Sequence, residues 1–313
     1  MKRFIINILL LALPIIVWGL IVVIVDPFNY FNFGIFNKDT KKSAESLNQL
    51  MYRTIDYIHF PCENMLIGDS RTELLPIDLI EKISKQKYKK LNTNAAKLNE
   101  IFELFYLAYK RKPIKRIVIG INFNMFNKYG YQNRISGLKK VLDDPLMYIY
   151  NKDVASATYV TIEQILKKKN VDSKPPMTRE EFWKWSISTK ASDWYGKYEF
   201  PNLLYSELLN FDRFTKKKGI EVIFIIVPHS EEFHKRLIEF GLGEEEKKFK
   251  KIMSSLNAKV YDFDYLNSIT TNKNNFRDPV HYNDSIGNLI VREIWTNNLQ
   301  FGKELDKNKK YIR

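Results

Sequence analysis

Two short motifs, separated by most of the chain, contain the residue types of a serine acyl-transfer site. Gly68-Asp69-Ser70-Arg71 places a serine just after an apolar run, and Asp278-Pro279-Val280-His281 places a carboxylate three residues before a histidine. In such a site Ser70 is the nucleophile, His281 the general base and Asp278 the group that orients the imidazole. This chemistry requires a fold that brings the two ends of the chain together.

Each motif also has a simpler interpretation. Asp69 or Ser70 would serve as an ordinary helix cap, because short polar side chains are favoured at that position. His281 would be a surface residue before a helix capped by Asn283 or Asp284. Neither motif is specific alone, and only their combination favours catalysis.

Alternating strand and helix patterns surround the first motif. Apolar runs over 64–67, 116–120, 221–227 and 258–262 predict buried strands, and apolar residues at helical spacing predict a helix over 99–112. Strands that are apolar throughout, separated by helices, indicate a parallel sheet covered on both faces. The predicted fold class is α/β, with three layers.

Ligands of open parallel sheets bind beyond the carboxyl ends of the strands. Ser70 follows the first predicted strand at such an end, which exposes its hydroxyl and makes its own backbone N–H available to an oxyanion. Asn122 follows the second strand in Gly120-Ile121-Asn122 and offers an amide donor there. Asparagine after a strand is also a common turn residue.

The N-terminal region predicts a membrane anchor. Phe4–Val25 is an almost unbroken apolar run of 22 residues, and at about 1.5 Å per residue it crosses a hydrocarbon core of about 30 Å. Lys2 and Arg3 precede the run and Asp26 follows it, which places the N-terminus in the cytoplasm and the rest outside. A cleaved signal peptide is the alternative, although residues 22–27 contain no small-x-small cleavage site.

We predict five regions along the chain. These are a transmembrane anchor over 1–26, a connecting segment over 27–59, an α/β domain over 60–300 with a helical insertion at about 125–210, and a charged tail over 301–313. The insertion carries an aromatic cluster, comprising Phe182, Trp183, Trp185, Trp194 and Tyr195. These rings would wall a cleft or stack on sugars, or else form the edge of a packed core.

Composition limits the partners and cofactors. Cys62 is the only cysteine, so no internal disulfide forms in an oxidising compartment. The net charge of +14 favours anionic lipid or polysaccharide as a neighbour over nucleic acid, unless it is simply a solvated surface. The four histidines match no metal-ligand spacing, and we expect no metal or other cofactor. His229, after Pro228 at a strand end, is either a second functional histidine or a loop residue.

The blocks Gly68-Asp69-Ser70, Gly120-Ile121-Asn122 and Asp278-x-x-His281, in this order and at strand ends, resemble the SGNH (GDSL) hydrolase superfamily. The resemblance covers roughly residues 60–300 less the insertion. It implies a flavodoxin-like three-layer α/β/α sheet and a Ser70-His281-Asp278 triad. It also implies an oxyanion hole made by the Ser70 N–H, Asn122 and a glycine of a second block. The anchor and insertion look most like the extracytoplasmic branch, which acylates polysaccharides and wall polymers, often beside a membrane-bound O-acyltransferase.

The second block departs from the family pattern. Aligned on Asn94, the chain has Ala96 and Asn99 where glycines are expected, and an alignment on Asn92 is the alternative. Asparagine tolerates a positive φ better than other non-glycine residues, so we expect Asn99 to keep the backbone donor of the oxyanion hole. Phe123 replaces the aspartate common in secreted esterases of this type, which the triad does not need.

The sequence therefore predicts a membrane-anchored extracytoplasmic O-acetyltransferase or acetylesterase. Ser70 would accept an acetyl group, and water or a hydroxyl of a surface polysaccharide or cell-wall polymer would resolve the acyl-enzyme. A tether beside a lipid-linked polymer raises the effective concentration of both partners, which favours transfer over hydrolysis. The alternative is a noncatalytic assembly or glycan-binding protein of the same fold that partners a membrane-bound O-acyltransferase.

Overall fold

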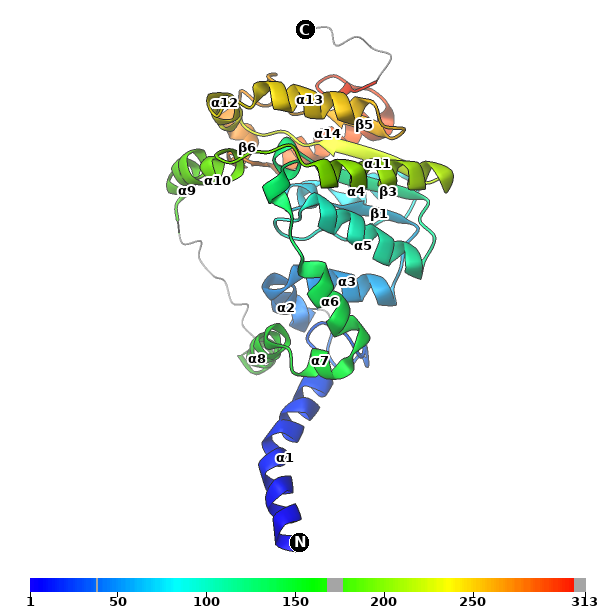
Figure 1. Cartoon of the computed structure of the whole chain (residues 1–313), viewed down its shortest axis with the longest axis vertical. Helices are drawn as coiled ribbons and strands as arrows, with labels where there is room; N and C mark the ends of the chain where they lie inside the picture. Colours follow the sequence, from blue (N-terminus) through cyan, green and yellow to red (C-terminus); the bar gives the residue numbers. More distant parts are fainter. Residues whose placement is uncertain (38, 168–176, 307–313) are drawn as a thin grey trace. The chain divides into compact units, whose positions relative to one another are not determined.

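The chain divides into two compact units, each built from two stretches of sequence. The computed structural model describes residues 1–37, 39–167 and 177–306 (Figure 1). One unit comprises Met1–Phe60 and Asn133–Lys174, and the other comprises Pro61–Gln132 and Pro175–Arg313. The residues of both candidate motifs belong to the second unit.

A six-stranded sheet forms the centre of the second unit, in the order β2-β1-β3-β4-β5-β8. All neighbours are parallel except β8, which runs antiparallel to β5. The central strands are almost completely buried, as their apolar runs predict. The strands are β1 (Asn64–Ile67), β2 (Lys89–Lys90), β3 (Arg116–Ile121), β4 (Glu221–Ile226), β5 (Lys259–Asp262) and β8 (Lys303–Glu304).

Helices cover both faces of this sheet, which confirms the predicted three-layer α/β class. On one face α4 packs on α14, and Ile80 and Ile290 join Ile225 of β4 in one apolar cluster. On the other face α5 packs on α11, and the Phe211 ring contacts the Phe224 ring (Figure 1). The helices of this unit are α4 (Ile77–Ser84), α5 (Leu98–Arg111), α9 (Arg179–Trp185), α10 (Ala191–Tyr195), α11 (Asn202–Lys217), α12 (Glu231–Glu239), α13 (Gly243–Ser254) and α14 (Asp284–Thr296).

Short elements near the ends of the strands carry or adjoin the candidate site residues Ser70, Asn122, Asp278 and His281. β6 and β7 form a small antiparallel pair, in which Asp278 and His281 are register partners. A π-helical turn, η5, joins α9 to α10. These short elements are η2 (Thr72–Leu74), η3 (Phe123–Met125), η4 (Lys128–Gly130), η5 (Ser186–Lys190), η6 (Lys273–Asn275), β6 (Phe276–Asp278) and β7 (His281–Tyr282).

The first unit is helical in its described part. Its first helix is followed by Asp26, which adopts a left-handed backbone and whose carboxylate accepts a hydrogen bond from the Tyr148 hydroxyl at 2.9 Å. Within the described residues, no helix combines the length and the apolar character that crossing a membrane needs. The elements are α1 (Lys2–Val25), η1 (Asp39–Lys41), α2 (Lys42–Leu47), α3 (Gln49–His59), α6 (Arg134–Asp143), α7 (Pro145–Ile149) and α8 (Lys152–Lys167).

Two predicted boundaries differ from the structure. The helical insertion of about 125–210 is not one piece, because Asn133–Lys174 belongs to the first unit and the remainder belongs with the sheet. Its Pro175-Pro176 dipeptide lies outside the described residues. The predicted charged tail over 301–313 begins with residues that join the sheet: Lys303–Glu304 forms β8, and Leu305 is buried while its N–H donates to the Val260 carbonyl.

Candidate active site

Close packing at two glycines brings the Ser70 loop against the end of β3. The buried Thr72 side chain fills the space beside Gly68 and Gly120, where an added Cβ would lie 2.1 Å and 1.9 Å from Thr72 Oγ1. Only glycine leaves room for this contact. Ser70 therefore sits in a turn directly beyond β1, at the carboxyl edge of the sheet, where the sequence predicts it.

Ser70, His281 and Asp278 form a continuous hydrogen-bonded chain. Ser70 Oγ lies 2.8 Å from His281 Nε2, and His281 Nδ1 lies 2.7 Å from Asp278 Oδ2. The two motifs are 211 residues apart in sequence. The β6–β7 pairing that opposes Asp278 to His281 explains why three-residue spacing aims the carboxylate at the imidazole.

The Asp278 carboxylate determines which imidazole nitrogen carries the proton. Burial acts to raise the pKa of Asp278, but the hydrogen bond and charge of His281 and the backbone N–H of Val280 outweigh it, and the pKa lies below its usual range. An ionised carboxylate only accepts hydrogen bonds, so His281 Nδ1 donates to it. Nε2 is then free to accept the Ser70 hydroxyl proton.

The Ser70 backbone N–H has no hydrogen-bond acceptor among the described residues. It lies beside the hydroxyl at the strand end. Preorganised N–H groups of this kind stabilise an oxyanion because they need no reorganisation during the reaction.

Asn122 differs from its predicted place in the oxyanion hole. Its side chain is completely buried, and Nδ2 donates to the Val227 carbonyl at 2.6 Å and to Asp264 Oδ2 at 3.3 Å. Both amide protons thus have acceptors inside the fold. In these contacts Asn122 links β3 to the segments that follow β4 and β5.

Asn99 also differs from its predicted role. It lies in the first turn of α5, where its Nδ2 donates to the Gln132 carbonyl at 2.6 Å and its Oδ1 accepts from the Gln132 N–H at 3.3 Å. Its backbone is not left-handed. Within 92–99 the positive φ, +52°, belongs to the exposed Ala95 instead. The second block therefore turns at a residue that neither family alignment identifies.

Arg71, next to the nucleophile, is held by an unusually complete set of partners. Its side chain is 1% exposed, and its guanidinium donates to Asp69 Oδ2 at 2.9 and 2.6 Å. It also donates to Asn124 Oδ1 and, at 2.6 Å, to Nε2 of His229. Arg71 holds the pKa of the buried Asp69 below its usual range, although burial alone would raise it.

His229 lies in the loop between β4 and α12, as one of its two interpretations predicts, but it is buried and is not positioned as a second base for Ser70. Both of its ring nitrogens are occupied: Nε2 accepts from Arg71, and Nδ1 lies 2.9 Å from Asp264 Oδ2. Burial lowers the pKa of His229 despite the adjacent carboxylate. This neutral histidine is a buried link between Arg71 and Asp264.

The predicted aromatic cluster divides into core and surface. Trp183 is 4% exposed and its indole N–H donates to Glu232, so it belongs to the core. Trp185 is exposed and packs on Phe182. Trp194 lies 5.2 Å from the Arg71 guanidinium and also contacts His229. Trp194 is thus in contact with Arg71, the residue that follows Ser70 in the sequence.

An acidic cluster near the site is balanced by a lysine. Side-chain atoms of His234, Glu246 and Asp264 lie within 4.8 Å of one another. Lys250 Nζ lies 2.9 Å from Asp262, 3.3 Å from Glu246 and 2.5 Å from the Asp264 carbonyl. The ammonium supplies the positive charge that a bound cation would otherwise provide.

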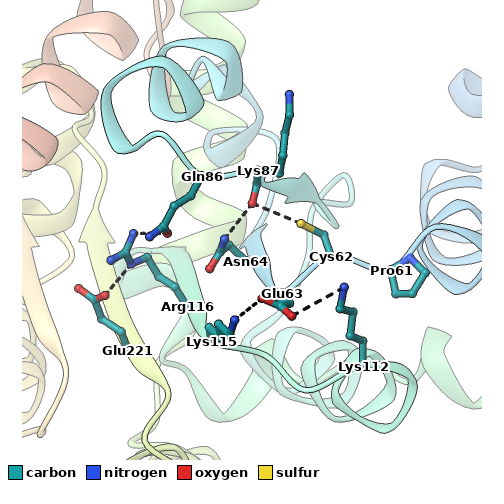
Figure 2. A pocket seen from close by; sticks show the side chains of 10 residues that line it. All are labelled: Pro61, Cys62, Glu63, Asn64, Gln86, Lys87, Lys112, Lys115, Arg116 and Glu221. Carbon is teal, nitrogen blue, oxygen red and sulfur yellow. Dashed lines mark hydrogen bonds and ion pairs between the residues drawn. The ribbon is translucent and has the colours of Figure 1, made fainter.

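A pocket of about 620 Å³ lies at the opposite edge of the sheet, away from Ser70. Figure 2 shows Asn64, Arg116 and Glu221, which start β1, β3 and β4, among its lining residues. Arg116 pairs with Glu221 at 2.6 Å, and Lys115 pairs with Glu63. Because parallel strands bring their amino ends to this edge, the pocket is no part of the site around Ser70.

No protein-family model matches the chain, and no curated protein matches it. Among solved structures it is similar to a protein from Desulfitobacterium hafniense described as lipolytic and of the G-D-S-L family, with 11% identity over 76% of this chain and 99% of that one and a TM-score of 0.38. It is similar to a Streptococcus pneumoniae protein described as a platelet activating factor, with 10% identity over 85% and 100% of the two chains and a TM-score of 0.38.

A third similar structure is a Bacteroides fragilis protein described as an acylhydrolase, with 11% identity over 76% and 88% of the two chains and a TM-score of 0.35. All three TM-scores are below 0.5, so the likeness carries no functional argument. We base the proposed function on the geometry around Ser70.

Proposed function

We propose that the protein is a membrane-anchored, extracytoplasmic serine acyl-transfer enzyme of the SGNH type, acting as an O-acetyltransferase or acetylesterase on a surface polysaccharide or cell-wall polymer. The observation that carries the acyl-transfer part is the hydrogen-bonded chain from Ser70 through His281 to Asp278. Those distances match what a nucleophile, its base and the orienting acid require.

In the proposed reaction Ser70 Oγ attacks the acyl carbonyl while its proton passes to His281 Nε2. The carbonyl oxygen becomes an oxyanion, and the free Ser70 N–H donates to it. As the tetrahedral intermediate collapses, the bond to the leaving alcohol breaks and His281 returns the proton to that alcohol. Water or a sugar hydroxyl then attacks acyl-Ser70 in the same sequence, which releases the serine and completes hydrolysis or transfer.

Asp278 acts through the imidazole in this scheme. Its low pKa keeps it ionised at neutral pH, where it holds Nδ1 protonated and stabilises the imidazolium as it forms. Catalytic residues are thus Ser70 and His281, with Asp278 as the acid that orients the base.

The membrane and polymer parts of the proposal rest on the sequence. The apolar run Phe4–Val25, preceded by Lys2 and Arg3, supports a single anchor with a cytoplasmic N-terminus. A cysteine-labelling test uses the single Cys62: in intact cells a membrane-impermeant maleimide should label it if the domain is outside. No labelling of intact cells, with labelling after lysis, would refute that orientation.

Transfer is tested by incubating the full-length protein in detergent micelles with an activated acetyl ester and surface glycan. We expect acetylated glycan with the parent protein and none with Ser70→Ala or His281→Ala. Acetate release without glycan acetylation would leave an esterase and reject the transferase.

A noncatalytic assembly or glycan-binding role is the second candidate. The engagement of both Asn122 amide protons within the fold favours it, because that leaves the site one oxyanion donor fewer than the family pattern implies. Ester turnover that depends on Ser70 would exclude this candidate.

A further inference from the structure

Lys190, the last residue of the π-helical turn η5, stands out among the cations near Ser70. Arg71 and Lys250 are buried and donate to carboxylates or carbonyls at close range. For Lys190, no hydrogen bond or ion pair is found in the described part of the chain. The fold thus gives the buried Arg71 and Lys250 direct partners, whereas the half-buried Lys190 ammonium makes no direct hydrogen bond or ion pair with a carboxylate among the described residues.

Two aromatic rings lie near the Lys190 ammonium. Nζ lies 5.3 Å from the centroid of the Trp194 ring and 5.8 Å from that of the Phe182 ring. Ring faces attract a cation but accept none of its strong hydrogen bonds. All three ammonium protons therefore stay available to a ligand.

The ammonium lies within electrostatic reach of both motifs. Trp194 contacts the Arg71 guanidinium, and Arg71 follows Ser70 directly. The charges of Asp278 and Asp69, one from each motif, both act on Lys190. Burial nevertheless lowers the pKa of Lys190, so the ammonium is partly desolvated. A desolvated charge without a direct partner gains most from a bound counter-ion.

The backbone at this position supports a functional role. Lys190 ends a π-helical turn between two α-helices. Single π turns are rare in proteins overall, and those that occur are often at functional sites. Lys190 is the last residue of η5, and Trp194 lies four residues later in the adjoining helix α10. This spacing brings the ammonium and the indole ring together.

We propose that Lys190, walled by Phe182 and Trp194, binds an anionic group of the substrate beside Ser70, so that the preferred substrates are esters carrying a carboxylate or a phosphate. The inference rests on the proposed function insofar as it calls the bound molecule a substrate. Binding of an anion at the subsite does not itself require turnover. A sugar acid and a sugar phosphate share the oxyanion chemistry that Lys190 would recognise. If the sugar ring of such a ligand stacks on Trp194, its carboxylate or phosphate would lie against the Lys190 ammonium.

The kinetic test uses three acetyl esters of similar shape with the full-length protein in detergent micelles. 4-Acetoxybenzoate and 4-acetoxyphenyl phosphate are anionic, and 4-acetoxybenzamide is neutral. We expect Lys190→Met to lower kcat/KM for the anionic esters about 10-fold relative to the neutral one, mainly through KM, which corresponds to about 1.4 kcal/mol. Lys190→Arg should keep most of the preference. Of the two anionic esters, the one whose kcat/KM falls more in Lys190→Met identifies the preferred group, carboxylate or phosphate.

Lys184→Met is the matched control, because Lys184 is exposed on the neighbouring helix α9 and its substitution removes the same charge. It should leave all three esters unchanged. An equal loss for neutral and anionic esters in Lys190→Met would overturn the subsite, as would the same charge-dependent loss in Lys184→Met.

Binding separates the subsite from catalysis. In Ser70→Ala protein, glucuronate and glucose 6-phosphate should quench tryptophan fluorescence at lower concentration than glucose, and adding Lys190→Met should abolish that difference. Lys190-dependent binding without ester turnover by the parent would refute the proposed function and keep the subsite. Ser70-dependent turnover, with binding and kinetics indifferent to ligand charge, would refute the subsite alone.

Discussion

The Tyr282 hydroxyl donates to the main-chain carbonyl of Arg71 at 2.7 Å, deep in the core. Tyr282 follows His281 and Arg71 follows Ser70, so one hydrogen bond joins the two motifs a single residue away from both reacting groups. This buried hydrogen bond therefore helps to maintain the 2.8 Å separation of Ser70 Oγ from His281 Nε2.

Tyr282→Phe should reduce turnover as well as stability. The ring stays but the tie to Arg71 is lost, which costs about 1 kcal/mol of unfolding free energy and lets the His281 imidazole drift from Ser70. We expect kcat to fall while KM changes little. Tyr265→Phe is the control, since its hydroxyl donates at the same 2.7 Å to the Phe301 carbonyl, which belongs to neither motif. If both variants lost turnover equally, the tie would have no specific effect on the site.

Arg71→Met should destabilise the protein by about 3–5 kcal/mol, because it leaves the Asp69 carboxylate buried without its partner. Urea denaturation measures the change. The double variant Asp69→Asn/Arg71→Met removes the stranded charge and should recover part of the loss. A double variant with the full sum of the two single losses would contradict a direct coupling.

Acidification from pH 7 to pH 5 should weaken the fold through His229. Burial lowers the pKa of this histidine in the folded chain, whereas in the unfolded chain it takes up a proton near pH 6.5. The unfolded state then binds more protons as the pH falls. The free energy of unfolding decreases by up to about 1.4 kcal/mol per pH unit for this one group.

The same stability is fully present above pH 6.5. His229→Asn keeps a donor for Asp264 but cannot take up a proton, so urea denaturation at pH 7, 6 and 5 should give a flatter profile for the variant. Parallel profiles for variant and parent would show that His229 is not the group responsible.

Ala95→Gly should stabilise the protein by up to about 1 kcal/mol. Ala95 has φ +52°, a left-handed conformation that costs a residue with a Cβ about that much and costs glycine little. Ala96→Gly is the control, because Ala96 has no positive φ and should become less stable on losing its buried methyl group. Thermal unfolding of both variants checks the prediction, and a lower Tm for Ala95→Gly would contradict it.

The strands were predictable because each is a local apolar run between polar ends. The runs over 64–67, 116–120 and 258–262 correspond to β1, β3 and β5 within a residue or two. In contrast, β8 has only two residues, Lys303 and Glu304, both exposed. Its position depends on pairing with β5, which no local pattern encodes.

The side-chain partners at the site were less predictable, because they depend on contacts distant in sequence. Asn122 donates to Val227 and Asp264, 105 and 142 residues away. Arg71 binds His229, 158 residues away, and nothing in the first motif distinguishes a buried arginine from an exposed one. The left-handed turn at Ala95 was unexpected because alanine disfavours it. By comparison, the Asp278-x-x-His281 spacing was informative because both residues lie on one short hairpin.

The reactivity of Ser70 is the central claim, and intact mass spectrometry tests it most directly. The full-length protein is exposed to an activated acetyl ester beside Ser70→Ala and His281→Ala. We predict one acetyl adduct on the parent, located on Ser70, absent from Ser70→Ala and strongly reduced in His281→Ala. A folded parent protein with no adduct and no ester turnover, or with an adduct that persists in Ser70→Ala, would contradict the account.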